Sequence, residues 1–413
     1  MLVNFEGYNF VEGGVVAAKG FQASGIHCGI RKNKEKKDLS LLTAAGPVPA
    51  AGVYTQNKVK GAPIFVTKEH IKDGYAQAVI VNSGIANTCN ADGIEKAEGM
   101  AHIAAKALGI NDDDVIVGST GVIGQPLPLE PIQEHIDELF NSLTSSPEGG
   151  LHFEEGIMTT DTQPKQVAVE FTLDGKACRI GGCSKGSGMI HPNMATMLCF
   201  LTTDVAITPQ MLQIALKRVV DDTFNMVSVD GDTSTNDTCC IMASGAAGNA
   251  VIEKQGEEFM QFVNALYVVL MNLSRMIAAD GEGATRLVEC VVSGAETKEQ
   301  ARIVSKSVIC SSLMKAAIFG ADANWGRALC AIGYAPVDVD VNKVDMSFAS
   351  VAGVLPVCKD GAGIPFSEEI AKEILSQSEV KLLINLNSGE EEATAWGCDL
   401  TYDYVRINGD YRS

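Results

Sequence analysis

The sequence predicts an α+β protein built as a layered sandwich, and three observations support this fold class. Short apolar runs suited to strands and longer stretches with helical spacing are mixed along all 413 residues, without a strict strand–helix alternation. The alternating stretches 165–172 and 176–180 flank Asp174-Gly175, which is typical of a β-hairpin. A chain of this length with 46% hydrophobic residues can bury a sizeable core, divided among roughly two or three structural units.

The first half of the chain supplies a mixture of short strands and helices. Apolar runs that end in polar, glycine-containing turns are typical of buried strands, and apolar residues at helical spacing are typical of helices. Gly109 ends one predicted helix, because glycine readily adopts the left-handed conformation that closes a helix. The predicted strands are 76–81 and 114–117, the predicted helices are 91–108 and 129–140, and 145–150 (SSPEGG) is predicted to be a loop.

The second half begins with a clear helix start. Thr208 is suited to cap a helix and Pro209 to occupy its first turn, ahead of apolar residues at helical spacing. The most apolar stretch, 262–273, contains two asparagines and predicts a buried helix rather than a membrane span. Further helices are predicted over 257–279, 298–313 and 367–375, and strands over 287–292, 380–385 and 393–402.

The composition excludes several classes of protein. The formal net charge is −19, so the chain has no electrostatic footprint for nucleic acid or for an anionic membrane surface. The twelve cysteines are scattered without a C-x-x-C pair and the six histidines do not cluster, which predicts reduced thiols and no metal site. The first residues lack the features of a secretory signal, so we expect a cytoplasmic protein. The common nucleotide, zinc and α/β-hydrolase motifs are missing from the sequence.

Six polar, glycine-punctuated stretches lie beside the predicted strands. Loops at strand ends are where functional sites are usually built, although each stretch alone is typical of a turn or a cap. Six of them in one chain favour a functional interpretation. The stretches are 118–124 (GSTGVIG), 159–165 (TTDTQPK), 185–197 (KGSGMIHPNMATM), 230–237 (DGDTSTND), 280–285 (DGEGAT) and 322–327 (DANWGR).

Thr196 lies where the third of these stretches changes into an apolar, strand-like run. One interpretation is an ordinary β-branched strand residue whose hydroxyl bonds to neighbouring backbone. The other is a nucleophile that becomes active as the first residue of a chain, because its own α-amine then serves as the base. This second interpretation requires a cut between Ala195 and Thr196, in which the hydroxyl attacks the preceding carbonyl and forms an ester that water opens. The local pattern alone leaves both interpretations open.

The stretch 185–198 (KGSGMIHPNMATML) resembles the cleavage and nucleophile motif of the ornithine acetyltransferase family, the glutamate N-acetyltransferases of the cyclic arginine pathway. The resemblance implies autoproteolysis between Ala195 and Thr196, giving an α chain of 1–195 and a β chain of 196–413. Thr196 then accepts acetyl from N-acetylornithine and passes it to glutamate. The resemblance runs nearly end to end, because further stretches match in order: 118–124, 158–165, 230–237, 280–285, 324–327 and 404–413.

The resemblance also implies the roles of individual residues. Thr120 and Gly121 match the family's oxyanion hole, which uses a side-chain hydroxyl and a backbone N–H. Lys185 is suited to pair with the substrate α-carboxylate, and Glu282 with the side-chain ammonium of ornithine. His191 is left undecided between tuning the cleavage loop and a structural role. The substrate-binding positions implied in this way are Thr162, Lys185, Thr196, Glu282, Asn408 and Ser413.

The family fold is a sandwich of the N-terminal-nucleophile type with a smaller C-terminal domain. It implies a main domain over 1–287 and a second domain over 288–413 whose tail returns to the active site. The two chains are expected to stay associated and to pair as an α2β2 heterotetramer. No metal or cofactor is implied, and the residues leave open whether acetyl-CoA is also an acetyl donor. The alternative on the same fold is a self-cleaving aminopeptidase or amidohydrolase, in which water replaces the second amino acid.

Overall fold

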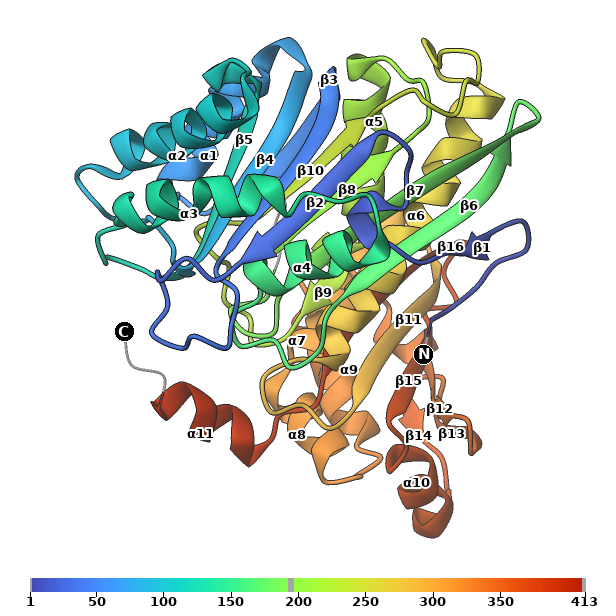
Figure 1. The fold of residues 1–413 in the computed structure, drawn as a ribbon. Helices are drawn as coiled ribbons and strands as arrows, with labels where there is room; N and C mark the ends of the chain where they lie inside the picture. The colour runs from blue at the N-terminus through green and yellow to red at the C-terminus, as the bar shows by residue number, and fades with distance from the viewer. Residues whose placement is uncertain (1, 192–196, 411–413) are drawn as a thin grey trace.

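The fold comes from a computed structural model of the chain, in which residues 2–191 and 197–410 are described. Figure 1 shows a large sheet flanked by helices, and a smaller region built mainly by the last third of the chain. The large sheet has two parts that share β3 (Leu39–Tyr54). The first half of β3 pairs with β2 and β4, the second half pairs with β10, and the register breaks between Thr43 and Val48. One long strand therefore joins the two parts.

Most neighbouring strands in the large sheet run antiparallel to each other. The exceptions are the pairs β4–β5 and β8–β10, which run parallel. The first part contains β2 (Phe21–Ile26), β4 (Tyr75–Ile85) and β5 (Val115–Val122). The second part contains β1 (Asn9–Phe10), β6 (Gln166–Leu173), β7 (Lys176–Lys185), β8 (Leu198–Thr203) and β10 (Thr238–Ala243).

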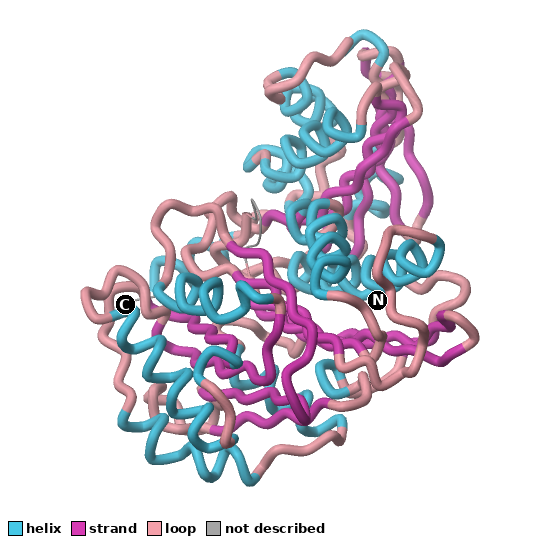
Figure 2. The backbone as a smooth tube through the Cα atoms, turned by 90° about the horizontal axis from the view of Figure 1, so that it is seen from above, coloured by secondary structure: helices cyan, strands magenta, loops and turns pink. Residues whose placement is uncertain are grey.

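The two parts of the large sheet face each other and are covered by helices on their outer sides. Because successive side chains of a strand point to opposite faces, Val79 and Val81 lie in the core between the two parts, whereas Ile80 contacts the outer helices. Phe153 of α4 packs edge-on against Phe200 of β8 in the inner core, with ring centroids 5.6 Å apart. The helices that cover the first part are α1 (Ala62–His70), α2 (Gly93–Leu108) and α3 (Glu130–Asn141). The helices that cover the second part are α5 (Pro209–Asp221) and α6 (Glu257–Ala279). The inner core between the two parts also contains α4 (Pro147–Ile157). This helix–sheet–sheet–helix order confirms the predicted layered sandwich, and Figure 2 shows the strands between the groups of helices.

A second sheet is formed almost entirely by the last third of the chain. Its order is β14-β13-β12-β15-β11-β16-β9, so one short strand from the middle of the chain, β9, joins its edge. The strands are β9 (Val227–Ser228), β11 (Leu287–Ala295), β12 (Asp345–Ser350), β13 (Gly353–Lys359), β14 (Ala362–Gly363), β15 (Glu379–Asn385) and β16 (Glu391–Cys398). The helices of this region are α7 (Lys298–Cys310), α8 (Ser312–Phe319), α9 (Trp325–Gly333), α10 (Glu368–Leu375) and α11 (Tyr402–Asp410). Short 3-10 helices cover Gly14–Val16, Ile71–Asp73, Asp112–Asp114, Phe224–Met226 and Val341–Lys343.

Helix α6 connects the two sheets into one core. It packs against β6 and β7 of the large sheet and against β11 and β16 of the second sheet. By length and composition it is the one helix in the described part of the chain that could cross a membrane, and 78% of its most apolar window is buried inside the protein. This confirms the predicted buried helix. A single apolar cluster extends from β6 through α6 to β16, across the proposed domain boundary at residue 287.

Local sequence signals fix several element ends as predicted. The side chain of Thr208 accepts the N–H of Met211 at the start of α5. Gly109 closes α2 in the left-handed conformation, with φ 69°. Asp174 and Gly175 both have positive φ, 50° and 68°, as a tight two-residue hairpin turn requires.

Three local predictions were wrong, and residues that favour the start of a helix explain them. The helix predicted over 298–313 is two helices, because Ser311 ends α7 and its side chain accepts the N–H of Met314 in α8. The stretch 145–150 is not all loop, because α4 begins at Pro147, a favourable first-turn residue. The strand predicted over 393–402 stops at Cys398, and α11 begins at Tyr402, where the Thr401 hydroxyl accepts the N–H of Tyr404 at 3.3 Å.

Candidate active site

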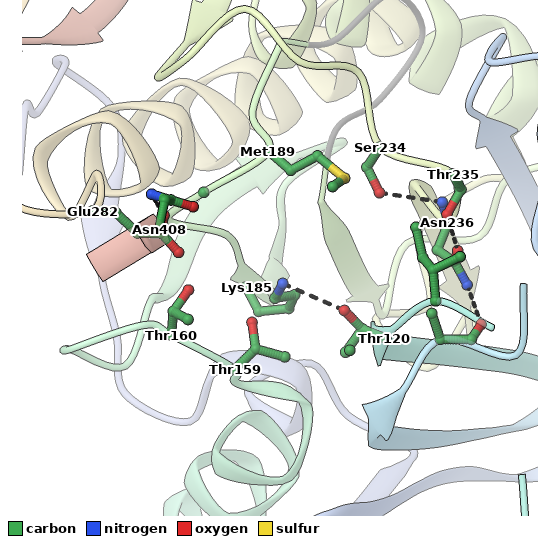
Figure 3. Close-up of a pocket in the computed structure, with 14 residues that line it drawn as sticks. Thr120, Thr159, Thr160, Lys185, Met189, Ser234, Thr235, Asn236, Glu282 and Asn408 are labelled. Carbon is green, nitrogen blue, oxygen red and sulfur yellow. Dashed lines mark hydrogen bonds between the residues drawn. The ribbon is translucent and has the colours of Figure 1, made fainter. Parts of the chain in front are cut away.

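Five residues singled out in the sequence line one cavity. Thr120 and Gly121 come from the end of β5, and Lys185 comes from the end of β7. Glu282 follows α6, and Asn408 lies on α11. The cavity has a volume of about 160 Å³, and Figure 3 shows the side chains of Thr120, Lys185, Glu282 and Asn408 around it. The fold therefore brings together side chains that are far apart in the sequence.

Further hydroxyl and amide side chains complete the lining. They belong to stretches that the sequence singled out, although the sequence did not indicate which of their side chains face the cavity. Thr162 is not among the lining residues that the structure describes. Its hydroxyl and its backbone N–H, the latter at 3.0 Å, both donate hydrogen bonds to the carboxylate of Asp280 instead. The other described lining residues are Ala86, Ile123, Thr159, Thr160, Gly188, Met189, Ser234, Thr235 and Asn236.

The end of β5 presents a hydroxyl and a backbone N–H beside each other. Gly121 has φ 130°, and a Cβ there would lie 2.3 Å from the carbonyl carbon of Gly84 on β4. Only glycine fits this conformation and this close approach. Lys185 Nζ donates to Thr120 Oγ1 at 3.4 Å, so the hydroxyl hydrogen of Thr120 is free to point elsewhere (Figure 3). This pair has the chemistry of an oxyanion hole.

Lys185 is an ammonium group in an almost closed environment. Its side chain lies at the end of β7 and is nine-tenths buried. Burial lowers the pKa of Lys185, and the like charges of Lys165 and Arg31 act in the same direction. The carboxylates of Asp161 and Asp237 oppose this shift. A buried ammonium that lines the cavity is suited to bind an anionic group that enters it.

The loop after α6 and the tail of the chain meet at Glu282. Asn408 Nδ2 donates to Glu282 Oε2 at 2.7 Å, and the backbone N–H of Glu282 donates to the carbonyl of Ser187 at 2.9 Å. A Cβ on Gly188 would come within 2.5 Å of the Glu282 carboxylate, so glycine leaves room for it. The carboxylate therefore lies directly against the 186–190 segment, where a cationic side chain could pair with it.

Asp230 fixes the backbone that leads toward the predicted cut, and the sequence did not single it out as an individual residue. Its two carboxylate oxygens accept the N–H groups of Met189 at 2.7 Å and Ile190 at 2.9 Å. Met189 has φ 56°, an unusual conformation for a residue with a Cβ. The hydroxyl of Tyr404 also donates to Asp230, at 3.3 Å, so the C-terminal helix and this segment share one anchor.

His191 lies outside the candidate cavity. Its Nδ1 is 3.1 Å from the hydroxyl of Ser228 and 3.5 Å from the thiol of Cys310. Burial lowers the pKa of His191 to about 4, and the charge of Lys306 adds to this, so the ring is neutral at pH 7. Its backbone carbonyl accepts the hydroxyl of Thr233 at 2.8 Å.

Three predicted positions, Ala195, Thr196 and Ser413, lie outside the described residues. The chain that follows Thr196 is firmly held: the carbonyl of Met197 accepts the N–H of Thr238 at 2.9 Å, and β8 then pairs with β10. Asn236 Nδ2 donates to the carbonyls of Ala86 and Ser119, which ties this region to the ends of β4 and β5. Within the residues described, no group of three His, Cys, Asp or Glu side chains is placed to hold a metal ion.

Comparison with known proteins gives a consistent result. The ArgJ family model matches residues 22–413. The arginine biosynthesis bifunctional protein ArgJ 1 of Clostridium acetobutylicum is 49% identical over 394 residues, which cover 95% of this chain and 96% of that protein. The ArgJ protein of Caldanaerobacter subterraneus subsp. tengcongensis is 47% identical over 98% of this chain and 99% of its own length. A crystal structure of the ArgJ protein of Bacillus halodurans matches with 45% identity and a TM-score of 0.50, covering 52% of this chain and 100% of the solved chain.

Proposed function

The chain belongs to the ArgJ family, and from this premise we propose that it is an acetyltransferase of arginine biosynthesis. It moves the acetyl group of N2-acetyl-L-ornithine to L-glutamate through an acetyl ester on Thr196. The observation that carries this proposal is the single cavity lined by Thr120, Gly121, Lys185 and Glu282 from separate parts of the chain. The cavity combines oxyanion donors, a cation for a carboxylate and a carboxylate for an ammonium, as a reaction between two amino acids requires.

The proposed chemistry takes place in two acyl-transfer steps. The hydroxyl of Thr196 attacks the acetyl carbon of acetylornithine, and its own α-amine takes the proton and passes it to the departing ornithine nitrogen. The oxyanion that forms is stabilised by the Thr120 hydroxyl and the Gly121 N–H. Lys185 supports this role of Thr120, because it fills one lone pair of the hydroxyl oxygen. The α-amine of glutamate then attacks the ester carbonyl, and the bond between the acetyl carbon and Thr196 Oγ breaks. The α-amine of Thr196 takes the proton from the glutamate nitrogen and returns it to Thr196 Oγ, which regenerates the enzyme.

The two ends of the cavity suit the two charged ends of the donor. We assign Lys185 to the substrate α-carboxylate and Glu282 to the side-chain ammonium of ornithine. Asn408 supports this assignment by donating to Glu282, which fixes the carboxylate at the cavity wall. Thr162 and Ser413 remain predicted binding positions. Thr162 would act through its contact with Asp280, which lies two residues before Glu282.

We also propose that the chain matures by autoproteolysis between Ala195 and Thr196. The length of the solved Bacillus halodurans chain supports this, because it is matched entirely yet covers 52% of this chain, close to the share made up by residues 196–413. The new N-terminus would lie next to β8, whose pairing with β10 provides a rigid mount. The cut lies within a shared core, so the α and β chains are expected to stay together.

Further parts of the proposal concern donors, assembly and location. We propose that acetyl-CoA is a second acetyl donor and that no resident metal or cofactor is needed. Assaying glutamate acetylation with acetyl-CoA tests the first point, and dialysis against a chelator tests the second. We further propose domains over 1–287 and 288–413, an α2β2 assembly and a cytoplasmic location. Mass measurement in solution tests the assembly, and the twelve free cysteines support the location.

The proposed function is tested by acetyl transfer from N-acetylornithine to glutamate, with free acetate measured in parallel. Acetylglutamate formation without comparable acetate release is the expected result, whereas acetate as the main product would favour the hydrolase alternative. Wild type should give two bands of similar mass on a denaturing gel in place of one 43.6 kDa band. Thr196→Ala should give one inactive band, while Thr172→Ala, on an exposed strand position, should behave as wild type. A Thr196→Ala protein that still splits and transfers acetyl would contradict the mechanism.

A further inference from the structure

A buried ion network lies behind the cavity and has no part in the proposed chemistry. At its centre is Lys165, whose side chain is 1% exposed. The ammonium donates to Asp161 Oδ1 at 2.7 Å and to Asp280 Oδ2 at 2.6 Å. Lys165 belongs to the hydroxyl-rich stretch that the sequence singled out, but none of the roles assigned so far uses it. Two carboxylates on one buried ammonium need a reason, because burying three charges is costly unless they are well paired.

Asp161 holds two segments that carry cavity residues. Its Oδ1 accepts the N–H of Gly186 at 2.7 Å, directly after Lys185. Its Oδ2 accepts the N–H of Thr159 at 2.9 Å. The carboxylate of Asp161 thus fixes the backbone next to Lys185 and the backbone of Thr159, which also lines the cavity.

Asp280 holds the other side of the same network. It accepts both the backbone N–H and the hydroxyl of Thr162. It lies two residues before Glu282, at the end of α6. Lys165 therefore links three segments, each of which places a side chain in the cavity: Thr160, Lys185 and Glu282.

The network also sets the charge around Lys185. The charged groups that face Lys185 are Asp161, Lys165, Asp237 and Arg31. Lys165 repels the Lys185 ammonium directly, and it also neutralises Asp161, the carboxylate that attracts this ammonium most strongly. Both effects favour the uncharged form of Lys185. Removing Lys165 would therefore raise the pKa of Lys185.

We propose that Lys165 is a positioning residue for the acetyl transfer. It holds Thr160, Lys185 and Glu282 around the cavity, and it weakens the electrostatic attraction between Asp161 and the Lys185 ammonium. This inference rests on the proposed function. It differs from a merely structural role because it predicts a change in the charge behaviour of a cavity residue. A matched structural control exists in Arg275, another deeply buried cation that pairs with two carboxylates, Glu289 and Glu379, and does not line the cavity.

The test compares Lys165→Met, Lys165→Arg and Arg275→Met in folded, purified protein. We expect Lys165→Met to lower kcat/KM by about tenfold or more per folded molecule and to move the basic limb of its pH profile upward by about one unit. Lys165→Arg should restore the limb to its wild-type position. Arg275→Met should lower the melting temperature while leaving the limb in place. An unmoved limb in Lys165→Met, or an equal shift in Arg275→Met, would overturn the inference.

A second readout does not depend on catalysis. The reactivity of the Lys185 amine toward trace acetic anhydride, measured by mass spectrometry across pH, reports its titration directly. The midpoint should move upward in Lys165→Met. If that variant does not fold, Lys165→Met/Asp280→Asn removes one charge of each sign and should show the same shift, because Asp161 no longer shares its charge with Lys165. If the wild-type protein transfers no acetyl group, the proposed function is refuted. If the midpoint of Lys185 labelling does not shift in the variant, this inference is refuted.

Discussion

Glu154 offers a test of how buried charge behind the cavity affects stability. Its side chain is fully buried on α4, and Oε1 accepts the backbone N–H of Lys165. Burial raises the pKa of Glu154 well above the ordinary value of a glutamate, although the ammonium of Lys165 opposes the shift. We predict that Glu154→Gln, which replaces the acid by an uncharged amide of similar shape, stabilises the folded protein increasingly as the pH rises.

The sign and size of this effect follow from proton linkage. Between the ordinary glutamate pKa of about 4.3 and the raised pKa in the folded state, the folded protein binds one more proton than the unfolded chain. The unfolding free energy therefore falls by about 1.4 kcal/mol for each pH unit in this window, and the effect is absent below it. The amide introduced by Glu154→Gln does not titrate, so the variant loses this pH-dependent penalty.

The assay is the melting temperature of wild type and Glu154→Gln from pH 4 to pH 7. The melting temperatures of the two proteins should be most similar at pH 4. The melting temperature of the variant should rise relative to that of wild type toward pH 7. Glu155→Gln is the matched control, because Glu155 is the next residue and pairs with Lys37 at 2.8 Å near the surface. A difference that stays constant with pH, or that shrinks toward pH 7, would refute the assignment of a raised pKa to Glu154.

Three further predictions concern the cavity and a helix cap. Thr120→Ala should lower kcat for acetyl transfer by about 10²–10³-fold with little change in fold, and Thr120→Ser should keep most of the rate, because serine retains the hydroxyl donor. Glu282→Gln should raise the KM for acetylornithine by about tenfold or more and leave the KM for glutamate nearly unchanged, since only the donor carries the side-chain ammonium; equal changes in both would contradict the assignment. Thr208→Ala should cost about 1 kcal/mol of stability by removing the cap of α5, without changing the transfer rate, and a melting temperature equal to wild type would contradict it.

Much of the local structure could be predicted because its causes are local. The hairpin at Asp174-Gly175 and the start of α5 at Thr208 depend on residues within a few positions of each other. The predictions that failed also had local causes, such as the cap at Ser311 that divides a continuous apolar pattern into two helices. Periodicity reports a buried face, but it does not report a change in helix direction.

The sequence by itself determined the layered fold class, the family and the stretches that form the candidate site, because glycine, hydroxyl and charged residues follow the strands in a recognisable order. Only the tertiary structure decided which side chains of those stretches meet. Thr160 faces the cavity and Thr162 turns to Asp280, because Lys165 and two carboxylates fix that loop from behind. The contact of Asn408 with Glu282 likewise depends on helix α11, which the sequence pattern did not predict. Such choices depend on packing between segments distant in sequence, which no local pattern encodes.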